Sequence, residues 1–261
     1  MAWTTTLPEL RAKALLKLVD ARQPVQLAVL AKKIKLRIRH VPSTGFDGAL
    51  VRIANRPSGI IAVRKNMEDP RKRFTIAHEI GHFVLPGHGE ESRICDEEEI
   101  DAPADEDNDE ANKDNNDLEQ AANKFAAELL MPSPVIRRIV TKCGISIDTC
   151  EFVSDLFQVS LTAAAARCVE ETPQYLRPAL VVSKKGMVKY FVKSLGFSQY
   201  VEINRPIPVG SLAKRLSARG ARKKAGYVSA PIWIDTRLDA LIQEESILLP
   251  GYDTVVTLLH S

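Results

Sequence analysis

The sequence predicts an α+β chain, in which helices and a small sheet come first and a smaller α/β region follows. A helix is predicted over 74–85, where apolar residues recur at helical spacing. Three earlier stretches are typical of strands, and these are 35–41, 48–53 and 59–63. After residue 173 the pattern becomes rich in strands, beginning with a hairpin over 179–192. We therefore expect two domains, 1–172 and 173–261.

The composition is that of an ordinary globular protein. Of the 261 residues, 45% are hydrophobic and 26% are charged, which is the balance of a folded domain and not of a disordered segment. No apolar run reaches about 18 residues, so a membrane-spanning helix is not expected. The N-terminus lacks the charged start and apolar core of a secretory signal. We expect a cytoplasmic protein without a membrane partner.

The four cysteines show no paired spacing. They are Cys95, Cys143, Cys150 and Cys168, and no two of them form a C-x-x-C motif. Reduced thiols are therefore expected, and a cysteine-based zinc site is not.

The net charge of +3 conceals a separation of charge along the chain, because 96–117 is acidic and 214–224 is basic. Residues 95–116 have almost no large apolar side chains, so we expect a mobile loop there. A calcium-binding loop is the alternative. Glu110 stands where an EF-hand needs glycine, and Asn116 stands where it needs a bidentate glutamate. The sequence therefore disfavours calcium.

Residues 7–21 and 24–31 predict two short helices at the start of the chain. A DNA-binding helix-turn-helix that begins within 24–36 is the alternative interpretation. The next element, 35–41, alternates as a strand does, whereas that motif needs a recognition helix there. The sequence therefore disfavours nucleic-acid binding through this segment.

Residues 78–82 have the sequence His-Glu-Ile-Gly-His, an H-E-x-x-H motif inside the predicted helix. A helix advances about 100° per residue, so His78 and His82 share a face and can offer two imidazole nitrogens to one metal ion. Glu79 lies beside them, close enough to reach a metal-bound water without being a ligand. Gly81 costs roughly 1 kcal/mol relative to alanine in a helix, which indicates that another segment approaches closely. Two hydrogen-bonded core histidines are the alternative.

A catalytic zinc site usually has three protein ligands, and two residues are candidates for the third. His88 stands where an H-E-x-x-H-x-x-G-x-x-H pattern has its third histidine, but the glycine of that pattern is Leu85 here. Glu119 begins a predicted helix over 118–131 and shares a face with Asn123, one turn later. An ordinary exposed acid is the alternative role for Glu119. The residues alone do not decide whether His88 or Glu119 is the third ligand.

Two segments together resemble the ImmA/IrrE-type zinc metallopeptidases. The first is R-F-T-I-A-H-E-I-G-H at 73–82, and the second is E-x-x-A-N-x-F-A-x-x-L-L-M-P at 119–132. The strand hairpin upstream and the L-F-x-V-S segment at 156–160 are also similar to that family. The resemblance extends over 10–170, and more weakly to the C-terminus.

The resemblance implies a zincin-like metallopeptidase domain with one zinc ion per chain. The zinc ligands that it implies are His78, His82 and Glu119. It favours Glu119 over His88 as the third ligand, and it implies that Glu79 is the general base. Asn123, which shares a face with Glu119, is a further candidate for contact with a metal ligand or the substrate. One departure is the acidic stretch between the two motifs, which makes their spacing longer than is typical of the family.

Members of that family are bacterial and phage cytoplasmic peptidases. Several cut helix-turn-helix transcriptional repressors and so switch on stress-response or mobile-element genes. The radiation-response branch has a C-terminal GAF-like domain, so the resemblance implies a GAF-like, sensory or regulatory role for 173–261. We therefore expect a zinc endopeptidase that acts in transcription regulation, with a repressor as its protein substrate.

We expect the substrate to lie extended along the strand over 59–63, as an added strand of the sheet. Two other classes of protein remain open. A non-proteolytic regulator with a structural or vestigial zinc site would bind DNA or a partner, with the cations of 214–224 contacting phosphates. A broad degradative peptidase would have the same site without a preferred repressor.

Overall fold

The computed structural model confirms the α+β class and describes most of the chain. The described residues are 6–19, 22–42, 45–53, 56–87, 93–95, 110–219, 222–236 and 240–260. They form two compact units, of which the first is Met1–Pro132 with Asp155–Ser160 and the second is Ser133–Ser154 with Leu161–Ser261. The domain boundary expected at residue 172 stays a prediction.

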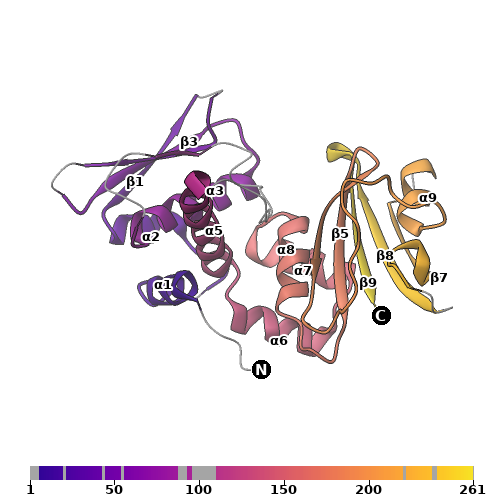
Figure 1. Ribbon diagram of the computed structural model, residues 1–261. Helices are drawn as coiled ribbons and strands as arrows, with labels where there is room; N and C mark the ends of the chain where they lie inside the picture. The colour runs from indigo at the N-terminus through magenta and orange to yellow at the C-terminus, as the bar shows by residue number, and fades with distance from the viewer. Residues whose placement is uncertain are drawn as a thin grey trace. The chain divides into compact units, whose positions relative to one another are not determined.

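The first unit contains a four-stranded sheet in the order β1-β3-β2-β4 (Figure 1). Its strands are β1 (Leu36–Val41), β2 (Gly48–Arg52), β3 (Gly59–Arg64) and β4 (Arg93–Cys95). Strand β3 pairs in parallel with β1 on one side and antiparallel with β2 on the other, and β2 pairs antiparallel with β4. The expectation that a substrate pairs with 59–63 is therefore wrong, because β3 already has a hydrogen-bonded neighbour on each side.

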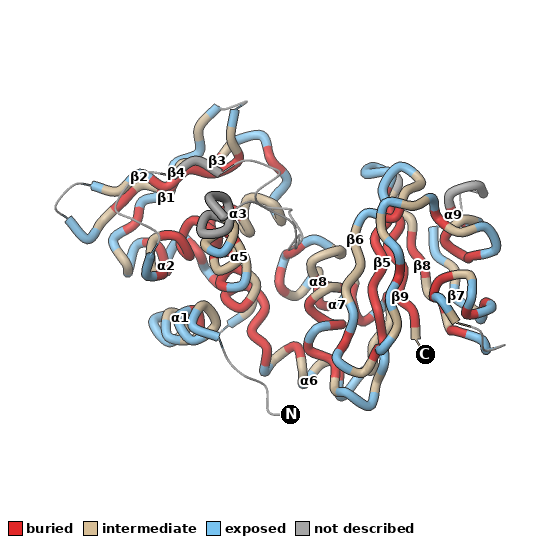
Figure 2. Tube along the Cα trace, viewed as in Figure 1, coloured by how far each residue is buried: buried red, intermediate tan, exposed pale blue. Residues whose placement is uncertain are grey.

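Four helices accompany this sheet. They are α1 (Leu7–Leu16), α2 (Leu27–Lys33), α3 (Asp69–Val84) and α5 (Glu110–Leu130). Helix α2 packs against β1, and α3 packs against β2 and β3 on the same side of the sheet (Figure 1). Helix α5 packs against α3, and α1 packs against α5. Because α3 lies between the sheet and α5, the whole stretch 75–82 is buried (Figure 2).

Helix α3 follows the signals in its sequence. Asp69 and Pro70 lie in its first turn, where a missing N–H is tolerated. A Cβ on Gly81 would lie 3.0 Å from Phe125 Cδ1 and 3.3 Å from the Ala122 Cα of α5. The close approach predicted at Gly81 is therefore confirmed, and it sets how near α5 comes to α3.

Helix α5 begins at Glu110, earlier than the predicted start at Leu118. The expected loop over 95–116 is therefore wrong in its last part, and residues 96–109 lie outside the described residues. Composition misled the prediction, because a helix nucleated by the packing of its apolar stripe gains one hydrogen bond for each residue added. Polar residues can then extend it without being buried.

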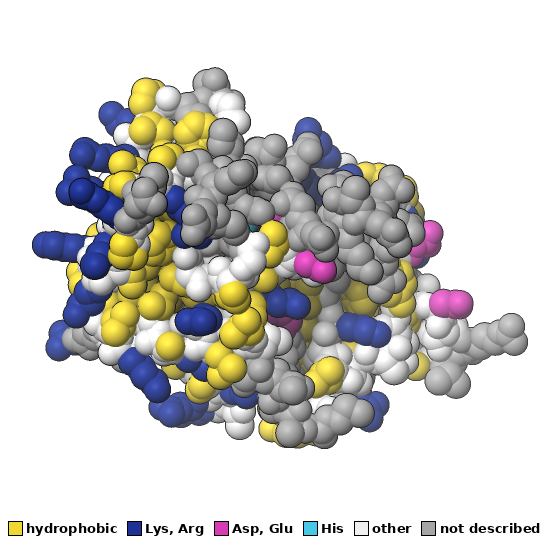
Figure 3. All heavy atoms as spheres, turned by 60° about the vertical axis from the view of Figure 1, so that its left-hand side comes forward, with side chains coloured by type: hydrophobic (Ala, Val, Ile, Leu, Met, Phe, Trp, Pro, Cys, Tyr) yellow, Lys and Arg dark blue, Asp and Glu magenta, His cyan; other side chains and the backbone are white. Residues whose placement is uncertain are grey.

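The surface of the first unit is rich in cations. Between residues 22 and 65 the sequence has a single acid, Asp47, which is buried and paired with Arg64 and Arg71. Many lysines and arginines lie toward the left of the space-filling view (Figure 3). Exposed cations follow one another from α2 into β1, and these are Lys32, Lys33, Lys35, Arg37 and Arg39. Residues 32–39 therefore present a run of cations to solvent.

The second unit contains an antiparallel five-stranded sheet in the order β6-β5-β9-β8-β7. Its strands are β5 (Pro178–Lys184), β6 (Met187–Lys193), β7 (Lys223–Ser229), β8 (Leu241–Leu249) and β9 (Thr254–His260). The helices are α6 (Ser133–Cys143), α7 (Ile147–Phe157), α8 (Leu161–Glu170) and α9 (Leu212–Arg219), with 3-10 turns η1 (Ala230–Ile232) and η2 (Pro250–Tyr252).

The hairpin predicted over 179–192 is confirmed as β5 and β6, with Lys185 and Gly186 at positive φ in its turn. Strands β5 and β9 are buried along nearly their whole length (Figure 2), because α8 packs against β5 and α9 packs against β9. Among the described helices, none alone has the length and apolar composition of a membrane span, and only the bent pair α7 and α8 reaches that composition jointly.

Candidate metal centre

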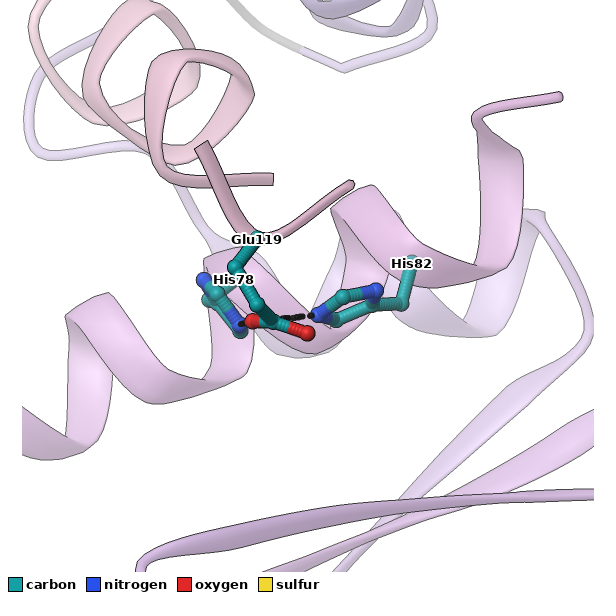
Figure 4. Close-up of side chains that lie close together, drawn as sticks. All are labelled: His78, His82 and Glu119. Carbon is teal, nitrogen blue, oxygen red and sulfur yellow. Dashed lines mark hydrogen bonds and ion pairs between the residues drawn. The ribbon is translucent and has the colours of Figure 1, made fainter. Parts of the chain in front are cut away.

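Three buried side chains of the first unit converge on one point (Figure 4). His78 and His82 come from α3, and Glu119 comes from α5. The two Nε2 atoms lie 2.9 Å apart, and Glu119 Oε2 lies 3.0 Å from that of His78 and 3.2 Å from that of His82. Both imidazoles are fully buried, and Glu119 is 7% exposed. The structure thus brings together residues that the sequence places in two separate segments.

The helical spacing of the two histidines accounts for half of this geometry. Residues four apart on α3 lie one above the other, and the two rings meet edge to face with their centroids 4.6 Å apart. The close crossing at Gly81 accounts for the other half, because it lets the α5 turn that carries Glu119 reach both rings. The three side chains are therefore positioned by helix packing and not by a loop.

Asn123 fixes the orientation of the first imidazole. Its Oδ1 lies 2.8 Å from His78 Nδ1, and an amide oxygen only accepts, so Nδ1 carries the proton. The neutral ring then has its lone pair on Nε2, the atom that faces His82 and Glu119. The His78 lone pair and a carboxylate oxygen therefore point at one another, which is an arrangement that suits a cation.

The carboxylate of Glu119 is ionised at neutral pH. Burial raises the pKa of this group, but a proton on the Nε2 atom of His78 or His82 would hydrogen-bond to it, outweigh burial and hold the pKa well below its usual range. A metal cation held between the same atoms acts on the carboxylate in the same direction. Two imidazoles and one ionised carboxylate are ligands that many divalent metals accept. The trio can therefore hold a metal ion.

Known proteins are similar to this region of the chain. The model of the IrrE N-terminal-like domain, a peptidase family, matches residues 31–169. The chain belongs to this family. All three candidate ligands lie in the matched stretch, so the family supports a metallopeptidase-type function with a metal cofactor and confirms the resemblance inferred from the two motifs.

Two relatives define how far this similarity extends. The radiation response metalloprotease IrrE of Deinococcus radiodurans is 29% identical over 137 residues, which are 52% of this chain and 37% of that protein. The chain thus matches little more than a third of that relative. A Mycobacterium tuberculosis transcriptional regulator of known structure aligns with 97% of this chain and 74% of its own, at a TM-score of 0.61 and 14% identity. At that identity the likeness shows the fold alone.

The remaining candidates from the sequence have different outcomes. Glu79 is fully buried on α3 and lies against β2 at Gly48. His88 lies outside the described residues. Sequence analysis missed Arg52 of β2, whose Nη2 donates a hydrogen bond to the His82 carbonyl oxygen at 2.7 Å. No local signal reveals this contact, because the two residues lie on different elements.

The basic segment 214–224 is partly neutralised within the second unit. Lys223 Nζ donates to Asp148 and Glu151 of α7, and Arg222 pairs with Glu151 at 3.6 Å. Burial lowers the pKa of Lys223, but its two carboxylate partners outweigh burial and raise it. These cations therefore contact carboxylates, which weakens the interpretation that they contact phosphates.

Proposed function

We propose that this protein is a zinc-dependent endopeptidase. One observation carries the proposal, namely the convergence of His78, His82 and Glu119 beside Glu79 in a chain of the IrrE N-terminal-like family. Zinc is the metal that the H-E-x-x-H arrangement most often binds, with two histidines as ligands and the glutamate as base.

The spacing of the ligand atoms fits a zinc ion. Zinc lies about 2.0–2.1 Å from nitrogen and carboxylate ligands, so the ligand atoms of a tetrahedral site lie about 3.3 Å from one another. The atoms of His78, His82 and Glu119 lie 2.9–3.2 Å apart, so small rotations would place them around the ion. A catalytic zinc usually takes three protein ligands and keeps one position for water, which agrees with a trio.

Glu79 and Asn123 have separate roles in the proposed peptide hydrolysis. A bound zinc ion would supply Lewis acidity, which polarises a peptide carbonyl and lowers the pKa of water toward neutrality. Glu79 accepts a proton from the attacking water and passes it to the amine that leaves as the peptide bond breaks. Asn123 holds His78 in the tautomer whose Nε2 lone pair faces the metal position.

The substrate that we propose is a helix-turn-helix transcriptional repressor, cut in the cytoplasm to switch on stress-response genes. The relative from Deinococcus radiodurans supports the stress-response part of this proposal, since its name joins a metalloprotease to a radiation response. We further propose that the first unit is a zincin-like domain and that residues 173–261 form a GAF-like regulatory domain.

The decisive experiment compares the zinc-loaded wild-type protein with Glu79→Gln. Both proteins are incubated with repressors encoded near their own gene and with β-casein, an unfolded general substrate. We expect the wild type to cut one repressor and to leave β-casein largely intact, and we expect Glu79→Gln to be about 10²- to 10⁴-fold slower with an unchanged zinc content. Undiminished cleavage by zinc-loaded Glu79→Gln would contradict the proposal. Equal cleavage of both substrates by the wild type would indicate a degradative peptidase instead.

A further inference from the structure

Strand β2 is fastened to α3 at both ends. Asp47, directly before the strand, lies 2.6 Å from Arg71 Nε in the first turns of the helix. At the other end, Arg52 Nη2 donates to the His82 carbonyl oxygen at 2.7 Å. Five strand steps of about 3.3 Å from Asp47 to Arg52 and eleven helix steps of about 1.5 Å from Arg71 to His82 span nearly the same length, about 16.5 Å. The strand and the helix are therefore tied together at two well-separated points.

Gly48 lies between these two attachments and faces the helix. A Cβ on Gly48 would lie 2.5 Å from Glu79 Oε1 and closer still to the Thr75 methyl group. Real Cβ atoms essentially never come within 3.0 Å of a neighbour. Gly48 is in a regular strand, so its backbone conformation does not require glycine. What requires glycine here is the space that the Glu79 carboxylate and the Thr75 methyl group occupy.

The atoms that a Cβ would meet are ends of side chains, whereas the backbones behind them are held. Glu79 and Thr75 are fully buried on α3, and the two end contacts keep β2 from moving away from the helix. An added methyl group would therefore be accommodated by rotation of the Thr75 side chain and of the Glu79 carboxylate. The helix that carries His78 and His82 would stay where it is.

We infer that Gly48 is a positioning residue for the reaction proposed above, and that it acts through Glu79. Its bare Cα lets the carboxylate rest against β2, beside the histidines, in the place from which Glu79 takes and returns a proton. This inference rests on the proposed function for its effect on rate. It adds a strand residue that the H-E-x-x-H motif does not contain.

The test is Gly48→Ala in the full-length, zinc-loaded protein, with Gly45→Ala as the matched control. Gly45 precedes the same strand, and a Cβ there would meet nothing within 4 Å. We expect kcat to fall roughly 100-fold in Gly48→Ala, because a misplacement of about 1 Å has that effect on a catalytic group. We expect KM and the zinc affinity, measured by competition with a chromophoric chelator, to stay within about twofold of the wild type. Gly45→Ala should match the wild type in all three.

A loss of kcat without a loss of zinc affinity distinguishes a positioning role from a merely structural one. An unchanged kcat in Gly48→Ala would overturn the inference. A parallel loss of zinc affinity would overturn it too, because the helix and not the carboxylate would then have moved.

Should the alanine variant fail to fold, Gly48→Ala with Thr75→Ser takes its place, and Thr75→Ser alone is its control. The serine removes the methyl group that the new Cβ would meet, and it leaves the clash with Glu79 in place. A low kcat with normal zinc affinity in the double variant supports the inference, and a wild-type kcat there overturns it.

A crystal structure of metal-free Gly48→Ala supplies a readout that needs no activity. We expect the Glu79 carboxylate to have turned away from β2 while His78 and His82 keep their places. A carboxylate in its original position would overturn the inference even if the peptidase assignment stands. If Glu79→Gln cleaves as fast as the wild type, the proposed function fails separately, whatever the position of the carboxylate in Gly48→Ala.

Discussion

Among the buried carboxylates, Glu119 of the first unit and Glu244 of the second have contrasting surroundings. Glu244 of β8 is fully buried and receives hydrogen bonds from three donors. These are the Ala213 N–H at 2.7 Å, the Trp233 Nε1–H at 2.8 Å and the Ser246 hydroxyl at 3.0 Å. Donors satisfy the lone pairs of a carboxylate, so Glu244 links α9, the segment after η1 and β8 as a structural element.

Glu119 instead lies against the ring nitrogens of two histidines. Its Oε2 faces the Nε2 atoms of His78 and His82, and the tautomer set by Asn123 leaves His78 Nε2 with a lone pair. The protein itself supplies the donors for Glu244, whereas Glu119 lies where it can share a cation with two imidazole nitrogens. The comparison teaches that burial alone does not mark a functional carboxylate, because the chemistry of its neighbours decides its role.

The strongest test of this contrast is Glu119→Gln. Glutamine has the shape of glutamate without its charge, so we expect the zinc affinity to fall more than 100-fold, beyond the effect typical of a group that only supports a ligand. In the wild type, free zinc at 100 times its Kd should raise the free energy of unfolding by about 2.7 kcal/mol. The variant should lose that increment, which thermal unfolding with and without zinc measures. A zinc-induced rise of wild-type size in Glu119→Gln would remove the distinction between the two carboxylates.

The matching change in the second unit is Glu244→Gln. The new amide group points N–H donors at donors, so at least one buried hydrogen bond is lost and its partner is left unsatisfied. We expect the free energy of unfolding to fall by about 2–3 kcal/mol in urea denaturation. The zinc-induced increment should be unchanged. If Glu244→Gln also altered the zinc affinity, the two carboxylates would not be independent.

A smaller effect is expected from Asn123→Ala. This change removes the acceptor that fixes the His78 tautomer, while both imidazoles and Glu119 remain. We expect the zinc affinity to fall about 10-fold, the lower end of the range for such supporting residues. Asn123→Asp keeps an acceptor at the same place and is the control, since it should bind zinc nearly as well as the wild type in chelator competition.

The smallest effect concerns a partly buried histidine of the second unit. Burial lowers the pKa of His260, and the charge of Glu245 only partly offsets this. The unfolded chain, with a pKa of about 6.5, therefore binds the proton more readily than the folded chain. Stability is unaffected by this group above about pH 6.5 and decreases as the pH falls below that value. His260→Gln should flatten this acid limb in urea titrations at pH 5–7, and an equally steep limb in the variant would assign it to other groups.

Sequence patterns predicted those features that depend only on residues close together in the chain. His78 and His82 lie one turn apart, so their shared face follows from helical spacing. The β5–β6 hairpin follows from its turn residues, since Gly186 sits at a φ of 77°. Glu119 lies 37 residues from His82 and was singled out from His88 chiefly by resemblance to a family.

Other features depend on contacts that no local pattern carries. Strand β3 alternates like its neighbours, and nothing in Gly59–Arg64 indicates that it lies between β1 and β2. Gly48 looks like an ordinary strand boundary until Glu79 is placed beside it. The start of α5 was predicted too late for a related reason, because packing further along the helix supports a polar first part.

The contact of Gly81 with Phe125 and Ala122 has a consequence for how relatives of this chain are found. Helix α3 and helix α5 hold each other directly, so the polypeptide that joins Val84 to Glu110 need not have any set length for Glu119 to meet the histidines. Insertions and deletions there are free to accumulate during evolution while the ligand trio survives. A pattern search that counts residues between the two halves of the motif will therefore overlook true members, whereas one that scores the helices separately will recover them.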